Sequence, residues 1–513
     1  MKKSKTVISI ILVSAMLILA SCTAAPSPSD YYNPINGNSD GKASYEYPSI
    51  SEKPAMEQIG NYDKEKKGIV ENQFIKTSEN AVSTFSADVD TASYTLLRRL
   101  LKNNYSLDEI ISTAGDSIRT EELVNYFKYD YKKPAENELF GVSCKLTPCP
   151  WNEESSLLTL GLQTEVPDKR LPNNLVFLID ISGSMYSEDK LPLLQRTFSY
   201  LTSNLTAEDT VSVVTYAAGE KTVLEGCAGN KADMIQSAIN SLRAEGSTNG
   251  EAGLKKAYEL AEKYYKPNGN NRIILASDGD LNVGMSSVDE IEKFVAEKRG
   301  QGVYISVLGF GYGNYRDSIM ETIADKGNGV YYYIDGEEEA EKIFGTDLLS
   351  TLYTVASDVK LQITFDSENV AEYRLIGYEN RVMNEEDFKN DTKDAGELGA
   401  GHSVTVCYEL KLKEGNETEN EGLFDLSVRY KKPGEEKSVQ NDYRFNLSIT
   451  SDPDADSDLI AALCELGMIL HNSEYGKNLT LDDVCLLLEG HDYGSDQYKA
   501  QFAQMIKELR IQN

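Results

Sequence analysis

Five short apolar runs alternate with helical stretches between about residues 174 and 350, and this alternation constrains the fold more than any other feature. Continuous apolar strands joined by amphipathic helices are typical of a mostly parallel sheet covered on both faces. A further run, TVLEG, closely follows VSVVTY and is expected to form an antiparallel edge strand. The pattern predicts a doubly wound α/β domain. Its apolar runs are LVFLID, VSVVTY, RIILASD, VYISVLGFG and YYYID, and its helical stretches lie near 189–204, 231–243, 249–265, 286–299, 315–326 and 337–348.

Alternating segments flank this domain on both sides. FGVSCKL and SSLLTLGLQT precede it, and DVKLQITF, HSVTVCYELKL, LFDLSVRYKK and YRFNLSIT follow it. Alternation of apolar and polar residues indicates half-buried strands. The most economical arrangement is one antiparallel β-sandwich formed by both flanks, with the α/β domain inserted between two of its strands. Two independent small β domains are the alternative. Helical periodicity near 89–127 and in the tail predicts helical segments at both ends.

The N-terminus has the features of a bacterial lipoprotein leader. MKKSK is basic, and TVISIILVSAMLILA is an apolar stretch of signal-peptide length. The following LASC resembles the lipobox, which is cut before a cysteine that receives a diacylglyceryl group, here Cys22. An ordinary secretory signal with an incidental cysteine is the alternative. Residues 23–74 are rich in Ser, Pro, Asn and Gly, which is typical of a disordered stalk. We therefore expect a cell-membrane protein, lipid-anchored on the extracytoplasmic face.

The chain is too long for one hydrophobic core, so several folded units are expected in its 513 residues. The patterns divide it into seven parts. We place a lipoprotein signal peptide at 1–21, a disordered lipid-anchored stalk at 22–75, an N-terminal helical segment at 76–135, sandwich strands at 136–170, the α/β domain at 171–352, further sandwich strands at 353–452, and a C-terminal helical region at 453–513.

Charge and cysteine usage exclude several functions. The leader contains three lysines, so the remaining chain has 48 basic against 82 acidic residues, a net charge of −34. This charge argues against binding to nucleic acid or flat contact with anionic lipid, but it permits cationic partners and divalent metals. Acidity for solubility alone is the alternative. Six cysteines besides Cys22 show no CxxC spacing, and the three histidines are not paired, so none is expected to ligate a metal.

Small oxygen-bearing side chains gather where three segments of the α/β domain end. Asp180, Ser182 and Ser184 directly follow the first strand, Thr248 precedes a helix in GSTNGEAGL, and Asp278 ends the strand RIILASD. In an open parallel sheet, ligands bind beyond the carboxyl ends of strands where the winding reverses. Two carboxylates and three hydroxyls suit Mg²⁺ or Mn²⁺, which prefer hard oxygen ligands. Serines that only cap the following helix are the alternative.

This set resembles the metal-ion-dependent adhesion site of von Willebrand factor type A domains, whose Asp-x-Ser-x-Ser, Thr and Asp are filled by the five residues above. A wider resemblance covers about residues 77–513 and points to a bacterial family of von Willebrand type A lipoproteins with an added N-terminal segment and a C-terminal domain of unassigned role. It is carried by STFSADVDTASY, IRTEELVNYFKYDY, TPCPWN, YRLIGYENR, DTKDAGELGAGHSV and LCELGMILHNSEYG.

The resemblance implies a binding function in the cell envelope. A cation held largely by neutral hydroxyls keeps much of its charge, so an Asp or Glu of a protein partner is expected to complete its coordination. In the family, ligand binding is often accompanied by a shift of the last helix, here 337–348. The alternative is a structural or scaffold lipoprotein, in which the metal only rigidifies the domain and binding uses the sandwich or the helices.

Enzymatic function is not expected. GFGYGN lacks the GxGxxG spacing of a dinucleotide loop, no GKS or GKT phosphate loop exists, and there is no GxSxG elbow. Ser182 and Ser184 have no nearby histidine to activate them. A role as subunit of an ATPase complex is disfavoured because ATP is scarce outside the cell.

Asp280 and Asn282 either add a cation contact or shape their loop, and loop shaping is favoured.

Overall fold

The computed structural model describes residues 69–167, 170–247, 250–279, 288–311, 317–413, 420–447, 449–450 and 453–512. All of them belong to the second of two compact units, Lys53–Asn513. The leader with Cys22, the expected ligand Thr248, and Asp280 and Asn282 lie outside the described residues. Within the described ranges, no helix combines the length and apolar character needed to cross a membrane.

The central domain contains the six-stranded sheet that the apolar runs predict. The strand order is β10-β9-β8-β5-β6-β7, and every neighbouring pair is parallel except β6 and β7. The antiparallel edge strand expected at TVLEG is therefore confirmed as part of β7. The strands are β5 (Asn173–Asp180), β6 (Thr210–Tyr216), β7 (Glu220–Ala228), β8 (Asn270–Ser277), β9 (Tyr304–Phe310) and β10 (Tyr331–Ile334).

Helices cover both faces of this sheet because alternate residues of its buried strands point to opposite sides. Leu175 and Phe177 of β5 share a core with α5 and α6, whereas Val176 and Leu178 share a core with α7, α8 and α9. The last expected helix, near 337–348, is instead three short pieces with a π-helical turn in the middle. The helices are α5 (Leu191–Thr202), α6 (Ala232–Asn240), α7 (Gly250–Lys263), α8 (Val288–Arg299), α9 (Asp317–Lys326), α10 (Glu337–Glu341), the π-helix η3 (Lys342–Thr346) and α11 (Leu348–Leu352).

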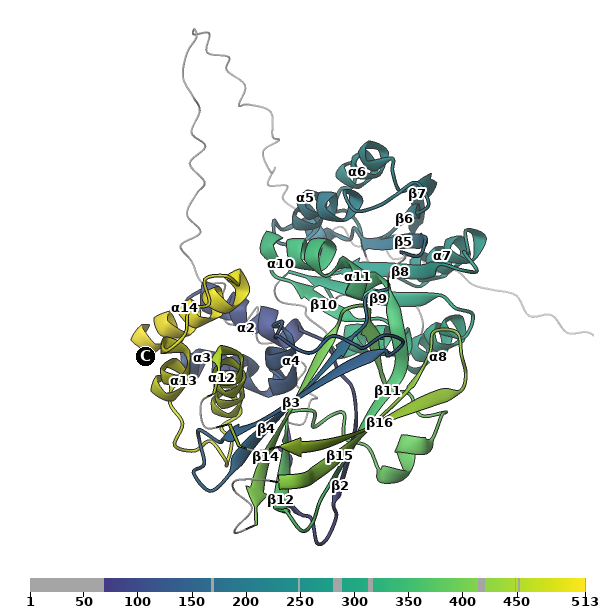
Figure 1. Ribbon diagram of the computed structural model, residues 1–513. Helices are drawn as coiled ribbons and strands as arrows, with labels where there is room; N and C mark the ends of the chain where they lie inside the picture. Colours follow the sequence, from purple (N-terminus) through teal and green to yellow (C-terminus); the bar gives the residue numbers. More distant parts are fainter. Residues whose placement is uncertain are drawn as a thin grey trace, which may run out of the picture. The chain divides into compact units, whose positions relative to one another are not determined.

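The flanking strands form two antiparallel sheets into which the central domain is inserted. One has the order β1-β12-β14-β4-β3, and the other has the order β13-β11-β15-β16, with β2 also paired to β11. β4, which precedes the central domain, pairs directly with β14, which follows it (Figure 1). The strands are β1 (Ile75–Lys76), β2 (Val82–Ser86), β3 (Phe140–Pro148), β4 (Ser156–Thr164), β11 (Thr354–Phe365), β12 (Val370–Ile376), β13 (Gly396–Gly399), β14 (Ser403–Leu412), β15 (Asn420–Lys431) and β16 (Ser438–Leu447).

The N-terminal segment begins with strands rather than with helix. β1 and β2 fall inside or beside the range expected to be helical, and both add to the sandwich. The short run VSTFS alternates in the way a half-buried strand requires, but it is only five residues long. Contacts with the folded core begin within the range assigned to the stalk, since the Asn72 side chain donates to the Gly377 carbonyl and Phe74 packs on Tyr475.

Helices from the two ends of the chain pack into one layer with its own hydrophobic core. Sequence periodicity predicts both sets of helices but not that they pack together. Several have strong start signals, such as the capping box of Ser106 and Glu109 at α3 and the Asp454 cap of α12. The helices are α2 (Ala92–Lys102), α3 (Leu107–Ala114), α4 (Thr120–Asn125), α12 (Ala455–Leu470), α13 (Leu481–Glu489) and α14 (Gln497–Gln512).

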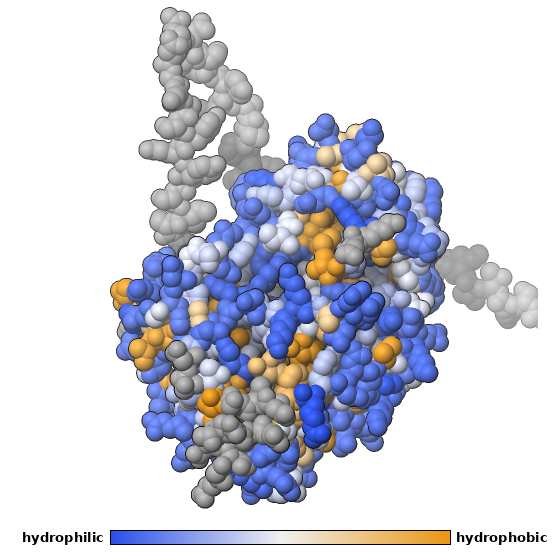
Figure 2. Space-filling view, in the orientation of Figure 1, coloured by the Kyte–Doolittle hydropathy of each residue, from blue (hydrophilic) through white to orange (hydrophobic). Residues whose placement is uncertain are grey.

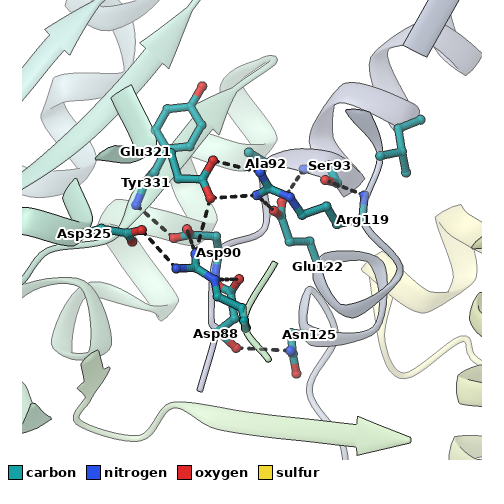
Figure 3. A network of polar contacts seen from close by, with 12 residues as sticks. Asp88, Asp90, Ala92, Ser93, Arg119, Glu122, Asn125, Glu321, Asp325 and Tyr331 are labelled. Atoms are coloured by element: carbon teal, nitrogen blue, oxygen red, sulfur yellow. Dashed lines mark hydrogen bonds and ion pairs between the residues drawn. The ribbon is translucent and has the colours of Figure 1, made fainter. Parts of the chain in front are cut away.

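A polar network joins the N-terminal segment, the sandwich and the central domain (Figure 3). Arg381, in the loop after β12, donates to Asp88 Oδ2 at 2.8 Å and to Asp325 Oδ2 of α9 at 2.9 Å. Arg119 forms a two-pronged contact with Glu321 of α9, with both distances 2.9 Å. Paired guanidinium–carboxylate contacts of this kind fix orientation as well as distance. The network therefore holds α9 in place against both neighbouring parts of the chain.

Candidate metal centre

The two predicted carboxylates lie at the point where the winding of the central sheet reverses. From β5 the chain first builds β6 and β7 on one side, and then returns to build β8, β9 and β10 on the other. Asp180 is the last residue of β5, and Asp278 directly follows its neighbour β8. The Ser277 hydroxyl donates to Asp180 Oδ2 at 3.3 Å, which links the two strand ends. Reversal points of this kind are the usual ligand sites of open α/β sheets.

The two serines turn toward each other in the loop after β5. Ser182 Oγ and Ser184 Oγ are 3.0 Å apart, and the Ser182 N–H donates to Asp180 Oδ1 at 2.8 Å. Ser182 precedes the short 3₁₀ helix η2 (Gly183–Tyr186), yet its side chain makes no capping bond. Lys190, not a serine, occupies the position before α5. The alternative interpretation, that these serines only cap a helix, is therefore not supported.

The segment that leads to Thr248 is fixed against the same loop. Gly183 N–H donates to the Gly246 carbonyl at 3.0 Å, and Glu245 N–H donates to the Ile181 carbonyl at 2.7 Å. Thr248 itself lies outside the described residues, so its place as a ligand stays a prediction. The backbone nevertheless reaches the Asp180 loop two residues before it.

Most oxygens of this group are buried, and Lys190 contacts the group with a positive charge. Asp180 is fully buried, and Ser182 and Asp278 are 2% and 3% exposed. Burial raises the pKa of Asp180 to about 6, although hydrogen bonds from Ser182 lower it. Lys190 provides the cation nearby, because its Nζ donates to Asp278 Oδ2 at 2.8 Å and to the Ser184 carbonyl at 2.9 Å. The ammonium group reaches the carboxylate through a side chain that is only 10% exposed.

The chemistry of the donors fits a hard divalent cation. The described part consists of two carboxylates and two hydroxyls, all oxygen, with Lys190 as a competing cation beside them. Mg²⁺ and Mn²⁺ prefer such ligands and retain several waters. Across the described ranges, no group of three or more His, Cys, Asp or Glu side chains is placed to hold a metal. This site differs from such clusters because hydroxyls provide two of its four described candidate ligands.

Sequence reasoning missed Lys190 and a second basic residue near the site. Arg99 of α2 donates to Asp189 Oδ2 at 2.5 Å and also contacts the Tyr333 hydroxyl. Tyr333 in turn donates to the Gly311 carbonyl, and the Lys190 side chain lies so close to Gly311 that a Cβ there would force it to shift. In the sequence, the signal for the role of Lys190 was its position in the same loop as the two serines. Of the glycine-rich GFGYGN segment, residues 312–314 lie outside the described residues.

The remaining metal-ligating residue types do not join this centre. The six cysteines within the described ranges are free thiols, and all but Cys144 are buried. His491 pairs with Asp458 in the helical layer, and His471 contacts the Ile118 carbonyl.

Family models match three successive parts of the chain. The model "von Willebrand factor" matches residues 61–159, "von Willebrand factor type A domain" matches 174–346, and "Uncharacterized protein YfbK, C-terminal" matches 350–511. The relative YfbK of Escherichia coli strain K12 is 38% identical over 465 residues, which is 85% of this chain and 79% of the relative.

The chain belongs to the von Willebrand factor type A (VWA) domain family that includes YfbK.

Matches to solved structures are more distant. A von Willebrand factor type A protein from Catenulispora acidiphila is 16% identical, and the match covers 66% of this chain and 80% of that protein with a TM-score of 0.39. Proximal thread matrix protein 1 from the mussel byssus, whose metal-ion-dependent adhesion site (MIDAS) motif is occupied by zinc, is 24% identical. The match covers 34% of this chain and 44% of that protein, with a TM-score of 0.29. VWA domains commonly hold a divalent metal at this motif, and the family is known for metal-dependent adhesion rather than catalysis.

Proposed function

We propose that this protein is a cell-envelope lipoprotein that binds a protein partner through Mg²⁺ or Mn²⁺ at the carboxyl edge of the VWA sheet. The observation that carries the proposal is the convergence of Asp180, Ser182, Ser184 and Asp278 at the reversal point between β5 and β8. These residues, with Thr248, would hold the cation. When bound, the cation supplies a positive centre that an Asp or Glu of the partner completes. No residue is proposed to act in catalysis.

A groove beside the candidate metal centre supports a protein partner. It has a volume of about 860 Å³ and runs between α5 and α6 from Tyr186, which is 80% exposed although it lies two residues after Ser184. Arg196 and Arg243 line it. Arg196 pairs with surface carboxylates, whereas Arg243 donates to the carbonyls of Asn240 and Leu242 and has no acidic partner among the described residues. Exposed aromatic and arginine side chains are typical of interface anchors.

The envelope location rests on the leader and on Cys22. A diacylglyceryl group on Cys22 would tether the protein to the extracytoplasmic face of a membrane. The measurement is incorporation of an alkyne-labelled fatty acid into the chain expressed in bacteria. We expect label in the wild type and none in Cys22→Ala, and equal labelling of the two would contradict the anchor.

The partner-binding role is tested by capture from an envelope extract with and without Mg²⁺. We expect the wild type to retain a specific partner in Mg²⁺, to release it in EDTA, and to recapture it when Mg²⁺ is restored. Asp180→Ala should capture none, while Asp233→Ala, which removes an exposed carboxylate of α6, should behave like the wild type. Amidation of carboxyl groups in the extract should also abolish capture, because the partner then has no acid for the cation.

The alternative scaffold role makes the opposite predictions in the same assay. Capture that persists in EDTA and in Asp180→Ala would place the binding surface on the sandwich or the helices. Capture that is lost in EDTA but resists amidation of the extract would keep the metal and reject the acidic partner residue. The unfolding temperature of each variant without metal must be compared with that of the wild type, so that loss of capture is not confused with loss of fold.

A further inference from the structure

A second cavity lies at the opposite end of the VWA sheet from the candidate metal centre. It has a volume of about 560 Å³ and is bordered by the residues that begin β8, β9 and β11, where the chain passes between the VWA domain and the sandwich. This volume is within the range of about 300–1,000 Å³ that is typical of small-molecule sites. The cavity therefore shares no residue with the metal-dependent function proposed above.

The walls of this cavity are largely apolar and partly exposed. Leu171, Tyr265 and Leu349 line it and are 46%, 41% and 37% exposed, although residues of these types are usually buried. Figure 2 shows apolar side chains gathered around α11, which carries Leu349, on a face that is otherwise mostly hydrophilic. Tyr304 and Pro433 are also part of the apolar lining. An apolar group that enters the cavity would remove this surface from water, which is favourable.

A buried arginine without a counter-ion lies directly behind the cavity wall. Arg272 of β8 is 2% exposed, and its Nε has no hydrogen-bond partner. Its two other contacts are neutral hydroxyls, Ser306 Oγ at 2.6 Å and Thr354 Oγ1 at 2.9 Å. No carboxylate among the described residues forms an ion pair with it. Burying a charge in this way is unfavourable unless an opposite charge compensates. Burial lowers the pKa of Arg272 to about 10, so the side chain is still charged at neutral pH.

The nearby acidic groups among the described residues form no ion pair with Arg272. Glu397 is buried, and burial together with Asp394 raises the pKa of its carboxyl well above the ordinary value. Asp209 is already paired with Arg170 at 3.0 Å on the rim of the cavity. Within the described part of the chain, the contacts of Arg272 are therefore the two hydroxyls and the Tyr304 ring.

Thr354 lies between Arg272 and the cavity, because it accepts a hydrogen bond from Arg272 and also lines the cavity. A guanidinium can only donate hydrogen bonds, so Thr354 Oγ1 must be the acceptor in its contact with Arg272. Its own hydroxyl hydrogen is then turned away from Arg272, and no acceptor for it exists among the described residues. Thr354 also lines the cavity. It is thus an oriented donor at one end of an apolar space, and the Tyr304 ring, 5.7 Å from the Arg272 guanidinium, adjoins it.

We propose that this cavity binds a small amphipathic monocarboxylate, such as a medium-chain fatty acid, with its carboxylate at Thr354 in front of Arg272 and its apolar tail between Tyr265, Leu171 and Leu349. The carboxylate accepts the Thr354 hydrogen bond and balances the buried charge. A neutral alcohol of the same shape gains the apolar contacts and a weaker hydrogen bond from Thr354, but it does not balance the charge.

The test is calorimetric titration of the full chain with decanoate and, as the uncharged probe, 1-decanol. We expect one decanoate to bind per chain, at least about tenfold more tightly than decanol. The reason is that a hydrogen bond to a charged group contributes enough binding free energy for about a tenfold difference in affinity. Thr354→Val should weaken decanoate binding about tenfold and decanol binding by a smaller factor, because the hydrogen bond to the neutral alcohol is weaker. Thr354→Ser keeps the hydroxyl and should keep the affinity. Leu349→Trp fills the cavity from a partly exposed position and should abolish binding of both probes.

Three results would overturn the proposal. They are equal affinity for decanoate and decanol, no decanoate binding at 1 mM, and unchanged binding in Leu349→Trp. The thermal unfolding temperature measured without ligand identifies a variant that fails to fold. If Thr354→Val fails to fold, the binding measured with Leu349→Trp still tests whether the probes occupy this cavity.

Discussion

Replacing Lys190 with methionine should make the candidate metal centre bind its cation more tightly. The Lys190 ammonium lies 2.8 Å from Asp278 Oδ2, and the lysine and aspartate side chains are only 10% and 0% exposed. A dication that uses Asp278 must compete with this contact or tolerate a like charge beside it. A hydrogen bond to a charged group contributes about 1.5–3 kcal/mol, and 1.4 kcal/mol is a factor of ten in affinity. We therefore expect Lys190→Met to bind Mn²⁺ at least about tenfold more tightly than the wild type.

Titration calorimetry with Mn²⁺ measures this affinity, and thermal unfolding gives a second readout. Without metal, Lys190→Met removes the ammonium group that contacts the buried Asp278, so the unfolding temperature of the variant should fall below that of the wild type. Mn²⁺ should then raise the unfolding temperature more in the variant than in the wild type. Lys298→Met, which removes a lysine paired with the exposed Glu262 on the helices, is the matched control and should change neither quantity. Equal or weaker Mn²⁺ affinity in Lys190→Met would refute the reasoning.

Two further predictions concern stability. Arg98→Met removes a fully buried guanidinium that joins α2 to Asp335 and Glu339, and it should lower the free energy of unfolding, measured in urea, by about 3–5 kcal/mol. The control Lys102→Ala breaks an exposed ion pair on the same helix and should lower this free energy by less than about 1 kcal/mol. Similar losses in the two variants would contradict this prediction. Burial and Asp483 raise the pKa of Glu465 in α12 to about 8. The folded pKa is above the unfolded value, so this group stabilises the fold below about pH 4.5 and loses that contribution as the pH rises through 8. Glu465→Gln should therefore match the wild type in unfolding temperature at pH 5 and exceed it at pH 9, by an amount equivalent to more than about 1 kcal/mol, and an identical pH dependence would exclude the effect.

The central sheet could be predicted from sequence because its strands are buried on both faces. Leu175–Ile179 of LVFLID and Ile273–Ala276 of RIILASD include no polar residue that would suggest a solvent face, and the polar ends of these two runs indicate the region of Asp180 and Asp278. The insertion into a sandwich could also be predicted, since both flanks alternate with period two. Local patterns were sufficient for these features.

The remaining features depend on contacts between distant segments. VSTFS is too short to be separated from the helices that follow it, and only pairing with β11 makes it a strand. The shared core of the terminal helices joins residues more than 300 positions apart, which no local period records. The role of Lys190 was missed for a similar reason, because the contact with Asp278 is formed only when β5 and β8 lie side by side.

Metal binding by the full chain tests the central claim most directly. Calorimetry with Mn²⁺ should show one ion per chain in the wild type and in the control Asp233→Ala. Asp180→Ala and Thr248→Ala should show no saturable binding while keeping the circular dichroism of the wild type. Undiminished Mn²⁺ binding by Asp180→Ala would contradict a metal centre at the reversal point of the VWA sheet.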